Sequence, residues 1–235
     1  MGEVKTGTFY GVSVGPGDPE LLTLKAVYCI RRCPVLAVPQ TVGGGMLALA
    51  IARNAVEIEG KTILPLRFAM SRDPAVLQAS HAAAADAVKA YLDAGQDVAM
   101  LNLGDVSIYS TYSYLEELLQ AEGYAAVRIA GVPSFCAAAA RLGQSLTGGM
   151  KQPLTIAPGR HAEQILCMPG TKILMKAGKE MKAVRAAILA SGQEAVMVEN
   201  CGMEGEKIYA NPAEIPDDAS YYSVIIVKEK QEEQA

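Results

Sequence analysis

Short apolar runs alternate with amphipathic segments through the first half of the chain, and this alternation restricts the fold more than any other feature. Residues 8–14 (TFYGVSV), 34–39 (PVLAVP) and 97–105 (DVAMLNLGD) are typical of strands buried on both faces. Residues 20–32 and 81–95 between them have apolar residues at helical spacing. Strands that alternate with helices predict an α/β fold with a mainly parallel sheet covered by helices on both faces.

After Gly143 the pattern changes. Only two convincing helices separate the next five strand-like segments, which are QPLTIAPG (152–159), TKILMKAG (171–178), EAVMVENCG (194–202), GEKIYA (205–210) and SYYSVIIVKEK (220–230). This pattern predicts a mixed sheet. The Gly-rich, polar stretch at residues 143–153 separates the two patterns. We therefore expect an N-terminal α/β domain at 1–145 and a C-terminal α/β domain with a mixed sheet at 146–235.

Composition narrows the class of protein. Half of the residues (51%) are hydrophobic, 20% are charged and the formal net charge is −4, which is typical of a globular protein and argues against a chain-wide nucleic-acid surface. The apolar runs are too short to span a membrane, and no signal peptide is readable. The five cysteines lack paired spacing, so we expect small buried thiols and a cytoplasmic location. The isolated His81 and His161 predict no metal site.

Ligands of an open α/β sheet bind beyond the carboxyl ends of its strands. Loops rich in Gly or Pro follow predicted strands at 15–18, 39–45, 103–112 and 131–135, and two more follow at 176–179 and 199–202. We expect these loops to converge on one active-site cleft between the two domains.

The loop 15-GPGD-18 resembles a phosphate-binding turn but lacks its requirements. It does not continue as G-x-G-x-x-G, and no acidic residue follows the second strand to bind a ribose. Pro16 also removes an N–H donor that a phosphate cradle would use. A tight turn in which Asp18 caps the next helix and Pro19 starts it is the local alternative.

Two polar residues after later strands allow two interpretations each. Asp105 is suited to accept hydrogen bonds from a ribose or an ammonium group, and it is equally suited to cap a helix that starts near residue 110. Ser134 has the same two possibilities at the start of the next helix. Arg67, Arg160, Lys176, Lys179 and Lys182 either face an acidic substrate or form a solvated surface.

Three motifs, GVSVGPGDPELLTLKA (11–26), LGDVSIYSTY (103–112) and GVPSFCAAAARL (131–142), resemble in order and spacing those of the tetrapyrrole (corrin and porphyrin) methylases. The resemblance covers residues 7–227. Later segments, ILMKAGK (173–179), VENCGMEGEKIY (198–209) and YYSVIIV (221–227), resemble the branch that methylates carbon 20 of precorrin-2 or cobalt-factor II in cobalamin biosynthesis.

This resemblance implies a two-domain enzyme, a homodimer, that uses S-adenosylmethionine and releases S-adenosylhomocysteine. Position by position, it implies that the cosubstrate contacts Pro16, Leu103, Gly104, Asp105, Ile108, Ser134, Phe135, Ala157, Lys176 and Cys201. The cosubstrate has a sulfonium and a carboxylate but no phosphate, which agrees with a glycine turn that contains a proline.

Methyl transfer to an electron-rich carbon depends on alignment and on exclusion of water more than on a strong acid or base. A base that removes the proton from carbon 20 would be Tyr109, Tyr112 or Glu199. Arg67, Lys176 and Lys179 would bind the acetate and propionate groups of the tetrapyrrole. Methylation at another position, methylation of uroporphyrinogen III and non-catalytic binding of a tetrapyrrole or nucleotide are the alternatives.

Overall fold

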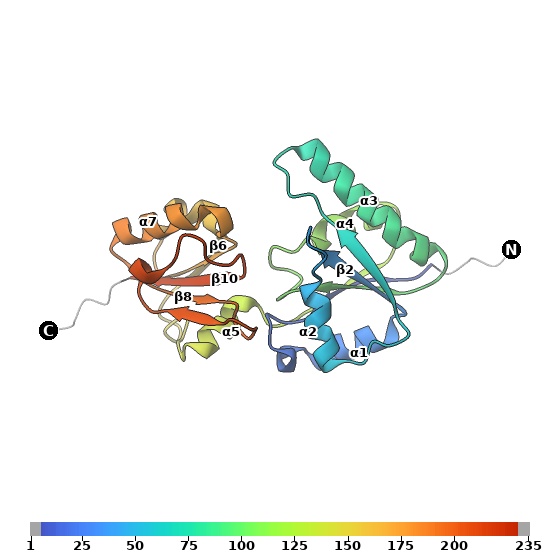
Figure 1. Ribbon diagram of the computed structural model, residues 1–235, viewed down its shortest axis with the longest axis horizontal. Helices are drawn as coiled ribbons and strands as arrows, with labels where there is room; N and C mark the ends of the chain where they lie inside the picture. Colours follow the sequence, from blue (N-terminus) through green and yellow to red (C-terminus); the bar gives the residue numbers. More distant parts are fainter. Residues whose placement is uncertain (1–5, 230–235) are drawn as a thin grey trace. The chain divides into compact units, whose positions relative to one another are not determined.

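A computed structural model describes residues 6–229 (Figure 1). The chain folds into two compact units, one extending to Pro133 and the other starting at Ser134. The boundary predicted after residue 145 would assign α5 (Ser134–Arg141) to the first unit. In the structure, α5 belongs to the second unit, where it packs against β10 (Ser223–Lys228). Within residues 6–229, no helix combines the length and the apolar character that a membrane span requires.

The first unit contains a five-stranded parallel sheet in the order β3-β2-β4-β1-β5. Its strands are β1 (Phe9–Ser13), β2 (Val35–Gln40), β3 (Thr62–Arg67), β4 (Val98–Asn102) and β5 (Ala126–Ile129). The strands predicted from the apolar runs at 8–14, 34–39 and 97–105 are confirmed as β1, β2 and β4, and the strand expected before the loop at 131–135 is β5. The predicted parallel α/β fold is therefore confirmed in this unit.

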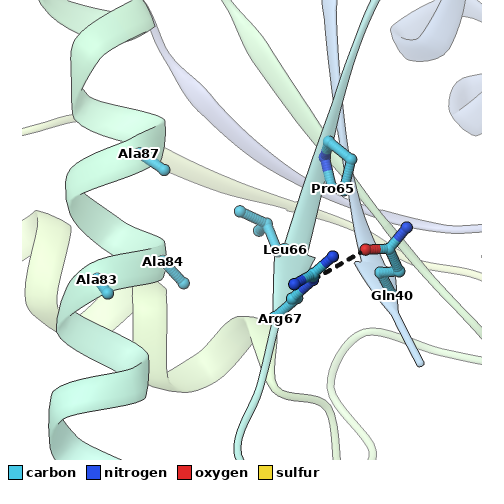
Figure 2. Close-up of a pocket in the computed structure, with 7 residues that line it drawn as sticks. All are labelled: Gln40, Pro65, Leu66, Arg67, Ala83, Ala84 and Ala87. Carbon is cyan, nitrogen blue, oxygen red and sulfur yellow. Dashed lines mark hydrogen bonds between the residues drawn. The ribbon is translucent and has the colours of Figure 1, made fainter. Parts of the chain in front are cut away.

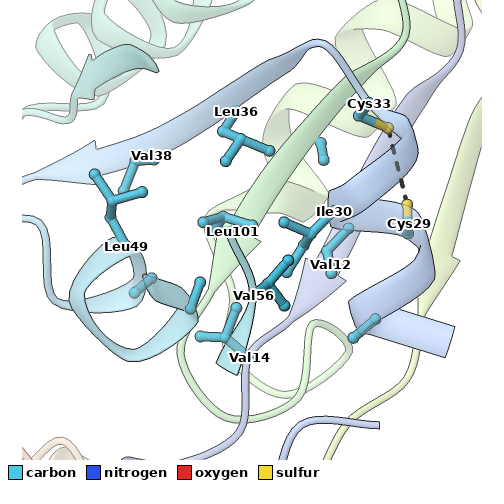
Figure 3. Packing of buried hydrophobic residues seen from close by; sticks show 14 of the residues in the cluster. Val12, Val14, Cys29, Ile30, Cys33, Leu36, Val38, Leu49, Val56 and Leu101 are labelled. Atoms are coloured by element: carbon cyan, nitrogen blue, oxygen red, sulfur yellow. Dashed lines mark hydrogen bonds between the residues drawn. The ribbon is translucent and has the colours of Figure 1, made fainter. Parts of the chain in front are cut away.

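Helices cover both faces of this sheet, as predicted (Figure 1). On one face, α1 (Leu24–Arg32) and α2 (Leu47–Ala55) pack their apolar sides against β1, β2 and β4. Figure 3 shows this cluster, in which Ile30 and Leu49 meet Leu36 and Leu101. On the opposite face, α3 (Pro74–Asp93) and α4 (Tyr112–Ala121) form a second core with Phe9 of β1 and with buried residues of β2, β3 and β4.

Two local features differ from the prediction. Strand β3 was not predicted because Pro65 interrupts its apolar run, and a strand containing proline is tolerated at a sheet edge, where β3 lies. The segment 20–32, predicted as one helix, is instead a short 3₁₀ turn (Pro19–Leu21) followed by α1. The turn is capped by Asp18, whose carboxylate accepts from Glu20 N at 2.9 Å, and α1 by Thr23, whose hydroxyl accepts from Ala26 N at 3.2 Å.

The second unit contains a mixed sheet in the order β6-β7-β10-β8-β9, which confirms the prediction for this half. The remaining strands are β6 (Leu154–Pro158), β7 (Thr171–Met175), β8 (Glu194–Glu199) and β9 (Lys207–Tyr209). Helices α6 (Ala162–Leu166) and α7 (Met181–Ser191) enclose its core, and Figure 1 shows α5 on the other side of this sheet.

The cysteines are all free thiols. Cys29, Cys33 and Cys201 are buried as expected, and the sulfur atoms of Cys29 and Cys33 lie 4.0 Å apart within the core of Figure 3. Cys136 and Cys167 are exposed, so the expectation of buried thiols was wrong for these two.

Candidate functional site

The candidate site of the first unit lies at the carboxyl ends of β1 and β4. These strands are neighbours in the sheet, yet β1 leads into α1 on one face and β4 leads into α4 on the other. The helices that follow these strands therefore lie on opposite faces of the sheet, and such a switch point is where open α/β sheets bind ligands. The GPGD loop and the LGDVSIYST loop are the two loops at this switch point.

Backbone contacts join these two loops directly. Gly104 N donates to Gly15 O at 2.7 Å, and Val14 N donates to Asn102 O at 2.9 Å. Gly15 and Gly104 form an isolated antiparallel bridge, and each has φ of +73°, a conformation that glycine adopts without strain. Their positive φ values are thus the reason that glycine is favoured at these two positions.

Ser13 and Gly131 bring a third loop, the one after β5, to the same place. The Ser13 hydroxyl donates to Ile129 O at 2.7 Å and accepts from Val106 N at 2.9 Å. A Cβ atom on Gly131 would lie 2.3 Å from Ser13 Cβ and 3.0 Å from Gly104 O, so only glycine allows this approach. Sequence reasoning did not select Ser13, although a polar residue in an apolar strand is a usable signal.

The loops after β1, β4 and β5 thus meet at one place, which we call the junction, and Asp105 is the charged residue there. Its side chain is 8% exposed, and one carboxylate oxygen accepts from Gly131 N at 2.7 Å. The other oxygen accepts from Ser107 N at 2.8 Å and from the Ser107 hydroxyl. Burial raises the pKa of Asp105, but the hydrogen bonds from Gly131 and Ser107 outweigh burial and the net pKa lies below its ordinary value.

Asp105 therefore links the loops after β4 and β5 as a carboxylate. It does not cap α4, because that helix starts at Tyr112 and its N-cap residue is Thr111; the helix-cap interpretation was wrong. The loops 14–18 and 103–108 contain no Lys or Arg. The lack of basic residues in these two loops disfavours a phosphate ligand. Arg128 on β5 lies close enough to Asp105 to help lower the pKa of its carboxyl group.

The second unit also gathers predicted residues at one sheet edge. Because β7 and β8 are both antiparallel to β10, and β6 is parallel to β7, the carboxyl ends of β6, β7 and β8 lie on the same edge. Ala157 is in β6, Lys176 directly follows β7, and Cys201 comes after β8. Lys176 and Asn200 have φ of +53° and +51°, a strained conformation for non-glycine residues that is found at functional sites.

Lys176 is half-buried, and burial lowers the pKa of its ammonium group. Its Nζ atom lies 5.9 Å from the centroid of the Tyr221 ring, within the range of a cation–π contact. The side chain of Lys176 is therefore packed beside Tyr221 at this sheet edge.

The three residues considered as a base have different surroundings. Tyr112 is fully buried, its ring stacks on Phe9 at 4.8 Å between centroids, and burial raises the pKa of its phenol. These contacts make Tyr112 part of the core and disfavour it as a base. Glu199 is 8% exposed and accepts from Tyr209 OH at 2.9 Å and from Ser220 N at 2.6 Å. Tyr109 is 40% exposed and has φ of +50° in the loop after β4.

The remaining predicted residues lie on several elements. Leu103 and Ile108 are half-buried in the loop after β4, and Pro16 is buried beside Gly15. Ser134 is the first residue of α5, and Phe135 is buried. His81 on α3 stacks its ring on that of Tyr114 of α4, with 4.4 Å between the centroids, and burial lowers the pKa of its imidazole. Among residues 6–229, no three His, Cys, Asp or Glu side chains are grouped as a metal site would require.

The basic residues proposed for an acidic substrate are spread over both units. Arg67, the last residue of β3, lines a pocket of about 480 Å³ with Gln40 and α3 (Figure 2). In the second unit, Arg160 lines a smaller pocket of about 170 Å³. Lys179 and Lys182 are exposed, and each is next in sequence to a residue that lines this pocket, Glu180 and Ala183 respectively. Gln40 was not predicted, because nothing in the sequence marks a strand-terminal glutamine as a partner of Arg67.

Comparison with known proteins places these features in a family. The family model of the Tetrapyrrole (Corrin/Porphyrin) Methylases matches residues 8–216. The chain is 30% identical to a precorrin-2 C(20)-methyltransferase of Sinorhizobium sp over 97% of both chains. It is also 30% identical to a cobalt-precorrin-2 C(20)-methyltransferase of Salmonella typhimurium, over 96% of this chain and 98% of the relative.

The fold agrees with solved structures. A uroporphyrin-III C-methyl transferase from Thermus thermophilus, complexed with S-adenyl homocysteine, superposes with a TM-score of 0.67 at 19% identity, over 94% of this chain and 97% of that one. Because the family model matches residues in both units and the relatives align over nearly the whole chain, this protein belongs to the tetrapyrrole (corrin/porphyrin) methylases.

Proposed function

We propose that this protein transfers a methyl group from S-adenosylmethionine to carbon 20 of precorrin-2 or of its cobalt complex in cobalamin biosynthesis. The observation that carries the proposal is the nearly full-length similarity to two relatives named for methylation at this carbon. The similarity spans both units, so it includes the loops at the carboxyl ends of both sheets.

The residues that would bind S-adenosylmethionine are those named from the family resemblance. In the first unit they are Pro16, Leu103, Gly104, Asp105 and Ile108, and in the second they are Ser134, Phe135, Ala157, Lys176 and Cys201. The first unit fits this molecule, since the negative charge of Asp105 favours a sulfonium or an ammonium and the loops 14–18 and 103–108 contain no basic residue that a phosphate would need. When bound, the molecule supplies an electrophilic methyl group.

The chemistry balances without a metal or a redox partner. A bond forms between carbon 20 and the methyl carbon as the bond between the methyl carbon and sulfur breaks. Carbon 20 then loses a proton. In this scheme the protein aligns the reacting carbon with the methyl group and excludes water. We propose Tyr109 or Glu199 as the group that accepts the proton. Glu199 would act through Tyr209, whose hydroxyl donates to its carboxylate, while the backbone N–H of Ser220 holds the other carboxylate oxygen in place.

The substrate would be held through its carboxylates. Arg67, Lys176 and Lys179 are proposed for this role because the tetrapyrrole carries acetate and propionate arms. We further propose that the protein acts as a homodimer, as the family resemblance implies, and that it is located in the cytoplasm, as its unpaired cysteines predict. Sedimentation equilibrium of the purified protein would test the dimer.

Incubation of the purified protein with S-adenosylmethionine and a tetrapyrrole tests the proposed activity. Precorrin-2 and its cobalt complex are used side by side, because the two relatives are named for different forms of the substrate. We expect the mass of one of them to increase by one methyl group, and a carbon-13 label on the methyl group to appear at carbon 20 by NMR. Methylation of neither substrate, or a label at another carbon, would contradict the proposal.

A further inference from the structure

We propose that Arg67 and Gln40 form a recognition site for one carboxylate arm of the tetrapyrrole, with Gln40 as the residue that orients the arginine. This proposal rests on the proposed function for the identity of the ligand. It goes beyond the general expectation that basic residues bind the substrate, because it assigns a defined pocket and a positioning residue.

Arg67 and Gln40 are the last residues of neighbouring parallel strands, and they are register partners in the sheet. Arg67 Nε donates to Gln40 Oε1 at 3.1 Å (Figure 2). In the described part of the chain, Nε is the only side-chain nitrogen of Arg67 with a hydrogen-bond partner. The two terminal nitrogens therefore remain available for the paired hydrogen bonds that a carboxylate accepts.

The side-chain amide of Gln40 is also hydrogen-bonded through its nitrogen. Its Nε2 donates to Gly44 O at 3.4 Å, in the loop after β2. That loop is closed by hydrogen bonds from Thr41 N to Gly45 O and from Gly44 N to Thr41 O, both at 2.9 Å. The amide of Gln40 thus links this closed loop to Arg67 and restricts the directions in which the guanidinium can point.

The backbone of Arg67 is also fixed. Ser80 on α3 donates its hydroxyl to Arg67 O at 3.3 Å and accepts from Ala69 N at 2.9 Å. An arginine held at its carbonyl and at Nε loses less conformational entropy when it binds an anion than a freely rotating one.

The pocket beside Arg67 has room for a carboxylate arm. Its volume is about 480 Å³, and the wall opposite β3 is made of small side chains of α3, namely Ala83, Ala84 and Ala87 (Figure 2). None of the residues that line it is acidic. The pocket therefore combines a positive charge with small apolar walls, which suits a short aliphatic chain that ends in a carboxylate.

Titration with uroporphyrin III, a stable porphyrin with acetate and propionate arms, tests this site independently of turnover. We expect Arg67→Gln to weaken binding by roughly tenfold or more, and Arg67→Lys to weaken it less, because lysine keeps the charge but loses the paired geometry. Arg53→Gln is the matched control, since it removes the same charge from an exposed position of the same unit, and its affinity should equal that of the wild type.

Gln40→Leu tests the positioning role. We expect it to raise KM for the tetrapyrrole several-fold while kcat, the affinity for S-adenosylhomocysteine and the unfolding midpoint stay unchanged. A parallel loss of kcat or of stability would show that Gln40 acts only structurally and would overturn its assignment.

Equal affinities of Arg67→Gln and Arg53→Gln for uroporphyrin III, or no binding by the wild type, would overturn the carboxylate site. If the wild type binds uroporphyrin III through Arg67 but methylates neither precorrin-2 nor its cobalt complex, the proposed reaction fails and the carboxylate site stands. The two proposals can therefore fail separately.

Discussion

Gly131 shows how a single residue determines the geometry of the junction. A methyl group on this glycine would lie 2.3 Å from Ser13 Cβ, so Gly131→Ala must push the loop after β5 away from β1. We expect a loss of roughly 1–3 kcal/mol in the free energy of unfolding, measured by urea denaturation. Gly43→Ala is the control, because no atom lies within 4 Å of its added Cβ, and it should leave stability nearly unchanged. Equal losses in both variants would contradict this packing argument.

The contribution of Asp105 to the free energy of unfolding should depend on pH. Its pKa is lowered in the folded protein, so its contribution to stability is complete above the pKa of the unfolded chain and is lost as pH falls through the folded pKa. We expect Asp105→Asn to cost about 1–3 kcal/mol at pH 7. In urea denaturation, the difference from the wild type should stay constant above about pH 5 and shrink below about pH 4.

Asp73→Asn serves as the control for this experiment. Asp73 is exposed and caps α3 through Ala75 N, and asparagine caps a helix as well as aspartate does. Its denaturation curves should therefore follow those of the wild type at pH 7. A difference between wild type and Asp105→Asn that does not vary with pH would refute the role of the carboxylate charge.

At the scale of elements, α3 illustrates what a local signal can and cannot predict. The Ala-rich segment from His81 was recognised as helix, but the helix starts earlier, at Pro74. Asp73 followed by proline is a helix-start signal in the sequence, and the Asp73 carboxylate accepts from Ala75 N at 2.9 Å. We expect Asp73→Ala to lower stability by about 1 kcal/mol, measured by thermal or urea unfolding, whereas Asp73→Asn does not. No loss in Asp73→Ala would show that the first turn is held by other contacts.

The strands and the loops were predictable to different degrees for a physical reason. Buried parallel strands leave a continuous apolar run, so β1, β2 and β4 are readable from the sequence alone. Strand β3 is an edge strand with Pro65 and lacks this signal. The junction of Ser13, Asp105 and Gly131 depends on contacts between residues far apart in the chain, and the contact of Gln40 with Arg67 depends on strand order. Local patterns carry no information on either.

At the scale of the whole molecule, the position of α5 distinguishes two possible boundaries. Lys228 on β10 donates to Ser145 O at 3.0 Å, and Arg141 Nε, at the end of α5, donates to Glu206 Oε1 at 2.5 Å. We therefore expect a fragment of residues 134–235 to show a cooperative thermal transition by circular dichroism. The shorter fragment 146–235 lacks α5, and it should unfold at a lower temperature or aggregate because it exposes the surface that α5 covers on β10. Equal stability of both fragments would favour the boundary at residue 145.

The bridge between Gly15 and Gly104 should slow hydrogen exchange and lower the cost of ordering these loops on binding. The amide hydrogen of Gly104 lies in a loop but is donated to Gly15 O at 2.7 Å, so it should exchange with deuterium as slowly as an amide inside a strand. Loops that already hold each other in this way need not be ordered when a ligand arrives, and the free energy of binding is not reduced by that ordering. The two glycine motifs, although separated by most of the first unit's sequence, therefore behave as one rigid surface before any ligand is bound.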